Sequence, residues 1–298
     1  MLPEIITFTK KKLLTAVGNR KSRIIFAPMN AKVSVLITNY NHAESLNRAI
    51  DSVLMQVTVF QVQVIVVDDH STDNSLDILR EYYTADQVSV VAFAEHYGLM
   101  KAYQIGFQRC EGQYIMLCDS DDRWCSTDKI QRQVEFMDEF TRCSLCVTKV
   151  FTQTDGITGT HPYSASFIND HLTYDNLLMG NAFIHAQSFC LRKSALDKYV
   201  DFDKFIRLGF HVWDYPIVLT LIQHSKFFCL DFYSAVYVKH VESVTNTQSR
   251  AKRFKYIMGN FRIRWYFIWH YGCKPSTLFF VLYKSGRDIL SVVFKRWK

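Results

Sequence analysis

Short apolar runs alternate with amphipathic stretches through the first half of the chain. Each run is short, unbroken and bounded by polar residues, which is typical of a buried strand. The predicted strands cover residues 33–38, 62–67, 88–93 and 114–118. In the stretches between them, apolar residues recur at the spacing of one helix face. The predicted helices cover residues 43–55, 74–83 and 100–109.

This alternation of strand and helix predicts an α/β fold. Strands that are apolar on both sides belong to a parallel sheet whose two faces are covered by helices. Connections between parallel strands of one sheet are right-handed. We therefore expect a Rossmann-like, mostly parallel sheet with helices on both faces.

Polar side chains follow three of the predicted strands. They lie at 38–41, at 68–71 and, with three carboxylates, at 119–122. Ligands bind at the carboxyl ends of the strands in open α/β sheets, and a hard divalent cation takes oxygen ligands. The last cluster therefore predicts a metal and diphosphate site. The alternative is a solvated acidic turn that caps the helix beginning near residue 126.

The second half of the chain is less regular. Residues 126–140 predict an amphipathic helix and residues 144–151 a strand. The polar stretch 152–181 has few periodic signals and is expected to be an acceptor-facing loop, followed by a strand at 183–192.

In order and spacing, these motifs resemble glycosyltransferase family 2 of bacteria. The matching segments are VSVLITNYN at 33–41, SVLMQ at 52–56, VVDDHSTD at 66–73 and CDSDD at 118–122. A further family motif, NxGxxxAxNxG, is matched by Gly98, Ala102 and Gly106, whereas His96 and Gln104 replace its asparagines. The resemblance covers about residues 33–245 and implies a GT-A fold with an inverting mechanism.

The resemblance also implies roles for residues on the donor side. Thr38 and Tyr40 would frame the nucleotide, with Tyr40 against the base, and Asp69 would accept a hydrogen bond from a uracil-like edge. Gly98 and Lys101 belong to the same donor site. Asp119 would lie by the ribose and share with Asp121 an Mn²⁺ or Mg²⁺ ion that bridges the donor diphosphate. His240 would meet the diphosphate or complete the metal shell, unless it is simply a packed or solvated histidine.

Asp214 is the expected catalytic base, which takes the proton of the acceptor hydroxyl. The family places a Glu-Asp pair here, and Trp213 replaces the glutamate. The alternative role of Asp214 is a carboxylate in the first turn of a helix. The resemblance further implies a set of acceptor-side residues, for which an ordinary strand with alternating sides is the competing interpretation of 183–192. The set is Asp122, Trp124, His185, Gln187 and Ser188.

Charge is concentrated at the carboxyl end. The 298 residues have a net charge of +7, yet residues 250–298 contain 12 Lys/Arg and one acid, Asp288. The other 249 residues contain 23 Lys/Arg and 27 Asp/Glu. Cationic and aromatic residues alternate in this tail, which is typical of helices that lie in a membrane interface. A helical hairpin that packs on the domain with a solvated basic face is the alternative, and no fold for nucleic-acid recognition accompanies the tail.

The cysteines and the apolar runs bear on location. Most of the eight cysteines lie in apolar runs, which favours reduced, buried thiols; the CxxC spacing of Cys143 and Cys146 has no second ligand pair for zinc. No apolar run is long enough to span a membrane, and residues 2–8 are too short for a signal peptide. We therefore expect a cytoplasmic protein, peripheral on the inner face of the cytoplasmic membrane.

Together these observations predict three segments and one activity. The segments are an N-terminal extension (1–31) with a short helix and a basic linker, a GT-A domain (32–249) and a basic, aromatic helical tail (250–298). The expected activity moves a sugar from a nucleotide donor, UDP above all, to a lipid-linked glycan or a surface polysaccharide such as the O-antigen of lipopolysaccharide. One alternative is a nucleotide-sugar-binding or scaffolding module without catalytic competence. A sugar-1-phosphate nucleotidyltransferase ranks lower, because no glycine-rich loop follows the first strand.

Overall fold

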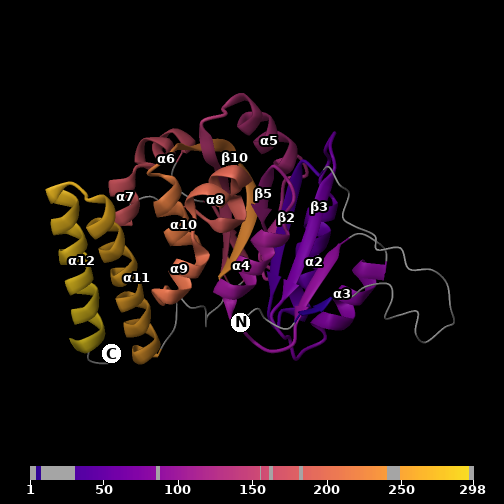
Figure 1. Cartoon of the computed structure of the whole chain (residues 1–298), viewed down its shortest axis with the longest axis horizontal. Coiled ribbons are helices and arrows are strands. Elements are labelled where there is room, and N and C mark those ends of the chain that lie inside the picture. Colours follow the sequence, from indigo (N-terminus) through magenta and orange to yellow (C-terminus); the bar gives the residue numbers. More distant parts are fainter. Residues whose placement is uncertain are drawn as a thin grey trace.

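A twisted sheet with helices on both faces forms the body of the molecule, and two long helices lie at one end (Figure 1). The computed structural model describes residues 5–7, 31–84, 88–154, 156–160, 164–180, 184–239 and 249–294.

The strands form one sheet in the order β1-β4-β3-β2-β5-β9-β7-β10-β6, with β8 paired to β7. They are β1 (Ile5–Thr7), β2 (Val33–Asn39), β3 (Val62–Asp68), β4 (Ser89–Phe93), β5 (Tyr114–Leu117), β6 (Arg123–Trp124), β7 (Cys143–Thr154), β8 (Ile157–Gly159), β9 (Cys190–Arg192) and β10 (Lys226–Lys239). Strands β4, β3, β2 and β5 are parallel neighbours, as predicted. Strand β9 is antiparallel to both β5 and β7, so β7 and its parallel partner β10 run in the same direction as β5.

Helices cover both faces of the sheet. They are α2 (Ala43–Leu54), α3 (Ser75–Thr84), α4 (Leu99–Arg109), α5 (Lys129–Glu139), α6 (Ala165–His171), α7 (Tyr174–Met179), α8 (Lys193–Tyr199), α9 (Phe202–Arg207), α10 (Asp214–Leu221), α11 (Arg250–Tyr271) and α12 (Pro275–Phe294). Alternate residues of β2 point to opposite faces, so Val35 packs with α2, α3 and α5, and Leu36 packs with α4 and the later helices. The predicted α/β class is therefore confirmed.

A close approach of two backbones sets the position of β5. The amide of Gly112 donates to Ser34 Oγ (2.8 Å), and a Cβ at residue 112 would lie 2.5 Å from the Ser34 nitrogen. Only glycine fits there. The turn before β5 is thereby held against the start of β2, and β5 carries the acidic residues that follow it.

Two expectations about local structure are wrong. The stretch 152–181 extends β7 to Thr154 and also contains β8, α6 and α7. These helices have six or seven residues, too few for helical periodicity to emerge from the sequence. The expected strand at 183–192 is a 3₁₀ turn (Ala186–Ser188) followed by the short β9. Residues 5–7 form a strand against β4, and the short helix expected within 1–31 stays a prediction, because residues 1–4 and 8–30 lie outside the described residues.

The cysteines and the helices agree with the sequence analysis. All eight cysteines are free, and six of them are buried. Among the helices that the structure describes, none is long and apolar enough to cross a bilayer. The tail predicted at 250–298 contains two helices, α11 and α12.

Candidate active site

The polar ends of three parallel strands meet at one edge of the sheet. Asn39 at the end of β2 donates from Nδ2 to the Asp68 carboxylate at the end of β3 (2.7 Å). On the other side of β2, Thr38 Oγ1 donates to Asp119 Oδ1 (3.2 Å). The convergence expected from the sequence is therefore present in the structure.

The acidic turn after β5 brings Asp119, Asp121 and Asp122 together. One carboxylate oxygen of each lies within 4.8 Å of the others. Burial, reinforced by the charge of Asp121, raises the pKa of Asp119 to about 7. Burial and the charges of Asp121 and Asp119 raise the pKa of Asp122 well above its usual range. Such a set of close, hard oxygen atoms fits a divalent cation, which would offset the repulsion.

Gln187 lies across two of these carboxylates. Its Nε2 donates to Asp119 Oδ2 (3.0 Å) and also to Asp122 Oδ2. The amide of Val238 on β10 donates to the other oxygen of Asp122 (2.7 Å). Gln187 thus supports the acidic turn, and its expected contact with the acceptor stays a prediction.

Tyr103 is a site residue that the sequence analysis missed. Its hydroxyl donates to Asp119 Oδ1, and its ring, fully buried, stacks on Trp213 with 3.7 Å between ring centroids. Its position on α4 fits the apolar periodicity of that helix, so the sequence indicated a core residue. Only its place within a family motif, between Ala102 and Gln104, could have pointed to the site.

Asp214 begins helix α10, directly after Trp213. Its Oδ1 accepts from the amide of Tyr215 (2.8 Å), and burial raises the pKa of its carboxyl above the usual value. Trp213, its neighbour in the chain, stacks on Tyr103, whose hydroxyl donates to Asp119. This packing brings the expected base to the side of the acidic turn.

The donor-side residues lie at the ends of β2 and β3. The ring of Tyr40, 41% exposed, stacks on His96 with 4.2 Å between centroids. Asp69 accepts hydrogen bonds from the amides of Tyr97 and Gly98, both at 2.8 Å, and its Oδ2 lies 3.0 Å from His96 Nδ1. Gly98 has a φ of +87°, a positive value that glycine adopts readily because it has no Cβ.

Asp69 has a raised pKa, chiefly because of burial. Since both of its oxygens already accept backbone N–H groups, contact with a nucleobase stays a prediction. Lys101 Nζ donates to Gln104 Oε1 (2.7 Å), and Gln104 in turn donates to Asp203 (2.8 Å). Gln104, which replaces the second asparagine of the motif, thus links Lys101 to Asp203.

The remaining acceptor-side residues lie around the acidic turn. Trp124 is buried, and its Nε1 donates to the carbonyl of Leu117 (3.3 Å). Ser188 is buried and donates to the carbonyl of His185 (2.6 Å), whose ring packs against Tyr237. Trp124 is thereby tied to the end of β5, and Ser188 to its own 3₁₀ turn, so contact of either residue with an acceptor stays a prediction. His240 falls outside the described residues.

Comparison with known sequences identifies the family. The profile described as Glycosyl transferase family 2 matches residues 34–200, more than half of the chain. The chain belongs to glycosyltransferase family 2. The family predicted from the motifs is therefore confirmed.

Two curated relatives of the family match over a part of the chain. A putative teichuronic acid biosynthesis glycosyltransferase, TuaG of Bacillus subtilis, is 38% identical over 108 residues, which are 36% of this chain and 42% of TuaG. The Escherichia coli protein WfaP is named a UDP-Glc:alpha-D-GlcNAc-diphosphoundecaprenol beta-1,3-glucosyltransferase. It is 32% identical over 108 residues, which are 36% of this chain and 41% of WfaP. The match thus spans less than half the length of these relatives.

Solved structures of other glycosyltransferases share the fold. S. aureus TarS 1-349 in complex with UDP-GlcNAc has a TM-score of 0.63 at 17% identity, over 87% of this chain and 73% of TarS. The mannosyltransferase PcManGT from Pyrobaculum calidifontis, in complex with GDP-Man and Mn²⁺, has a TM-score of 0.62 at 13% identity, over 89% and 73%. These likenesses confirm the GT-A fold.

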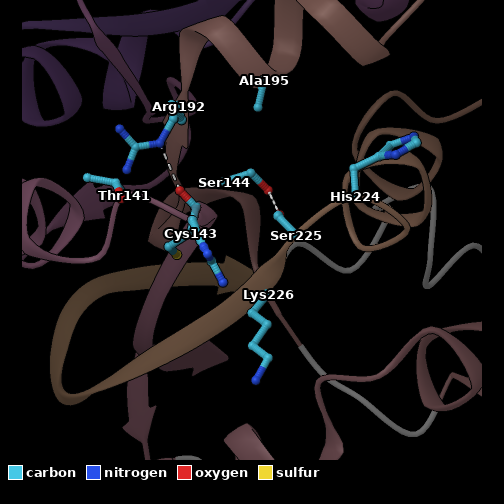
Figure 2. A pocket seen from close by; sticks show the side chains of 9 residues that line it. Thr141, Cys143, Ser144, Arg192, Ala195, His224, Ser225 and Lys226 are labelled. Carbon is cyan, nitrogen blue, oxygen red and sulfur yellow. Dashed lines mark hydrogen bonds between the residues drawn. The ribbon is translucent and has the colours of Figure 1, made fainter.

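Figure 2 shows a pocket whose lining includes Ser144, Arg192 and Lys226, and this pocket is not at the acidic turn. It is lined at the amino ends of β7 and β10, and the acidic turn follows the carboxyl end of β5, which runs in the same direction. The basic residue Arg192 points into this region, where its Nε donates to the carbonyl of Cys143 (2.9 Å) and Ser144 pairs with Ser225. Because the pocket contains none of the residues at the carboxyl ends of the strands, we assign it no role in catalysis.

Proposed function

We propose that this chain is a metal-dependent, inverting glycosyltransferase that uses a nucleoside diphosphate sugar, UDP-sugar above all. The observation that supports this function best is the placement of a partly buried carboxylate, Asp214, next to Trp213, whose ring stacks on the tyrosine that donates to Asp119 of the acidic turn. Asp214 is then available to receive a proton, and the carboxylates of the acidic turn are available to hold the metal ion that binds the diphosphate. The UDP-GlcNAc bound to TarS and the name of WfaP support UDP as the nucleotide.

Asp121 and Asp119 are the proposed metal ligands. A bound Mn²⁺ or Mg²⁺ would bridge the donor phosphates and neutralise the charge of the departing diphosphate. The fit rests on three carboxylate oxygens within 4.8 Å of one another and on the raised pKa values of Asp119 and Asp122, which follow from burial and from the charges of the neighbouring carboxylates. The Mn²⁺ in PcManGT supports a divalent metal.

Asp214 is the proposed general base. It takes the proton of the acceptor hydroxyl as that oxygen bonds to the anomeric carbon and the bond to the diphosphate breaks. A single displacement inverts the anomeric centre and needs no enzyme nucleophile. The raised pKa suits this role, because a more basic carboxylate accepts a proton more readily, and activity should fall as the pH drops through that pKa.

The nucleotide would lie over the ends of β2 and β3. Tyr40 offers an exposed ring to the base, with His96 stacked behind it, and Thr38 fixes Asp119 beside the ribose. Asp69, Gly98 and Lys101 complete the donor side of the site.

We propose a lipid-linked glycan or a growing surface polysaccharide as the acceptor. The name of WfaP includes a diphosphoundecaprenol acceptor, and that of TuaG includes teichuronic acid biosynthesis. Such an acceptor is presented at the inner face of the cytoplasmic membrane, which is the proposed location of this chain.

Thermal stabilisation by nucleotides tests the donor site. A ligand that binds the folded state alone raises the melting temperature. We expect UDP with Mn²⁺ to raise it, UDP without metal to raise it less, and Asp121→Ala to abolish the metal-dependent part. If no nucleoside diphosphate shifts the melting temperature under any metal condition, the donor site is wrong.

Replacing the base tests catalysis separately. Asp214→Asn keeps the shape of the side chain but removes the proton acceptor, so UDP release from UDP-sugars should fall about a hundredfold or more. Stabilisation by UDP and Mn²⁺ should stay unchanged. Asp197→Asn, at an exposed ion pair with Lys193, is the matched control and should keep full turnover. Full turnover in Asp214→Asn would refute the assignment.

A further inference from the structure

Helices α11 and α12 lie side by side at one end of the molecule, away from the sheet (Figure 1). Their inner sides join the core of the domain through Ile263, Phe267 and Val281. Their outer sides hold large apolar side chains that nothing in the described structure covers. Trp269 is 79% exposed and Phe279 is 73% exposed.

Most of the exposed apolar residues form one stripe on each helix, and Tyr271 and Leu282 lie outside the stripes. On α11 the stripe consists of Phe254, Met258, Trp265 and Trp269. Because these residues are spaced by four, seven and four, all four lie within a sector of about 60° around the helix axis, on the side opposite Ile263. On α12 the stripe consists of Phe279, Tyr283 and Leu290, again spaced by four and seven. We call these two stripes the outer stripes.

Charge narrows the choice of partner for the outer stripes. Helix α11 contains six Lys/Arg and no Asp or Glu. A second copy of this helix would bring like charges together, and so would the amino-terminal segment, which contains Lys10, Lys11, Lys12, Arg20, Lys21 and Arg23. The complementary partner is therefore anionic, and it must also accept a long row of aromatic side chains.

An anionic lipid surface has both properties. Aromatic side chains, tryptophan above all, lie at the level of the lipid headgroups, and Lys/Arg are attracted to anionic lipids. A helix with an apolar stripe and cationic flanks lies in the interface rather than across it. The absence of a spanning helix among the described residues agrees with that orientation.

We propose that the outer stripes of α11 and α12 dock the protein on an anionic bilayer. The two helices would lie in the headgroup layer with their inner sides still packed on the domain. This inference deepens the proposed lipid-linked acceptor but does not require transfer, because vesicle binding is measured without any donor.

Co-sedimentation with vesicles tests the surface. The full chain should bind vesicles that contain about a quarter phosphatidylglycerol in phosphatidylcholine, and it should bind pure phosphatidylcholine vesicles much more weakly. High salt should weaken binding to the anionic vesicles. The double variant Trp265→Ser/Trp269→Ser should bind about tenfold more weakly. The matched control Val57→Ser/Val59→Ser removes exposed apolar residues elsewhere and should bind as the unchanged protein does.

Tryptophan quenching then reports which residues enter the bilayer. In a Trp297→Phe background, Trp124 and Trp213 are buried and should be silent, so brominated lipids should quench only Trp265 and Trp269. Trp265→Phe/Trp269→Phe should keep vesicle binding and lose the quenching.

Unquenched tryptophans on bound protein, or binding that the serine variant leaves unchanged, would overturn the proposal. So would preferential binding to a nucleic-acid oligonucleotide. Loss of UDP binding would leave this result untouched and would concern the donor site alone.

Discussion

Gln187 shows how a single side chain orders the acidic turn. It is nearly fully buried, and its one amide nitrogen reaches both Asp119 and Asp122. Thr38 and Tyr103 hold the other oxygen of Asp119, and Val238 holds the other oxygen of Asp122, but Gln187 is the donor that links the two mutually repelling carboxylates. The amide thereby holds both oxygens on one side, where Asp121 also lies. We therefore regard Gln187 as a positioning residue for metal binding.

Removing this donor should weaken metal binding. For Gln187→Leu we expect the Mn²⁺ concentration that gives half-maximal stabilisation by UDP to rise about tenfold or more, as for other residues that orient metal ligands. Gln113→Leu is the control, since Gln113 is exposed at the opposite edge of the sheet. A lower melting temperature with an unchanged Mn²⁺ requirement would mean that Gln187 only supports the fold.

Lys129 is a second buried polar residue near the site. It is fully buried, its Nζ donates to Gln133 Oε1, and the amine lies 4.7 Å from the centroid of the Trp124 ring. Burial lowers its pKa to about 8. In the unfolded chain the amine keeps its ordinary, higher pKa, so the unfolded state binds more protons above about pH 8. The free energy of unfolding should therefore rise with pH in that window.

The pH dependence of stability tests this lysine. Relative to Lys129→Met, the unchanged protein should gain about 2 kcal/mol of unfolding free energy between about pH 8 and pH 10, from the shift in pKa. Chemical denaturation at each pH measures it, and the comparison cancels the titration of tyrosines and cysteines. Lys252→Met, at an exposed position, should show no such trend. A pH-independent difference for Lys129→Met would show that the amine does not change its charge in this range.

At the scale of elements, the sequence predicted the strands and helices that are long enough to show a regular spacing of apolar residues. Strands β2 to β5 and helices α2 to α4 have long, clean patterns, and their bounds differ by only one or two residues from those expected. Helices α6 and α7 are too short for a periodic signal. They begin instead at caps, since Ser164 and Thr173 accept from the amides of Phe167 and Asn176. Read as helix starts, these two residues could have corrected the expected loop.

The sequence could predict the site residues that follow strands, but not those that tertiary packing brings to the site. Asp119, Asp121 and Asp122 follow a strand directly, so the topology alone brings them to the edge where Thr38 and Asp69 lie. Gln187 and Tyr103 reach the same edge from a 3₁₀ turn and from a helix face, and their contacts depend on tertiary packing. Spacing along the chain could not reveal that Tyr103 would stack on Trp213 next to Asp214.

At the scale of the whole molecule, α11 and α12 have features of both alternatives for the tail, a hairpin packed on the domain and helices that lie in a membrane interface. Their inner sides pack on the domain, as a hairpin would, and their outer stripes stay exposed. Phe267 and Trp269 of α11 distinguish the two sides, since Phe267 is 1% exposed and lies in the core that α4 and α10 share. The inner side should therefore contribute to global stability and the outer side should not.

Alanine substitutions at these two positions test whether the hairpin and the domain unfold as one unit. Phe267→Ala removes a buried ring and leaves a cavity, so we expect a loss of about 3 kcal/mol in the free energy of unfolding. Trp269→Ala should change it by less than about 0.5 kcal/mol, because an exposed side chain loses little packing. Denaturant unfolding should show one transition in both variants. If Phe267→Ala instead produces an early, separate transition, the hairpin is a unit that opens independently, and its inner side would also become available to the bilayer.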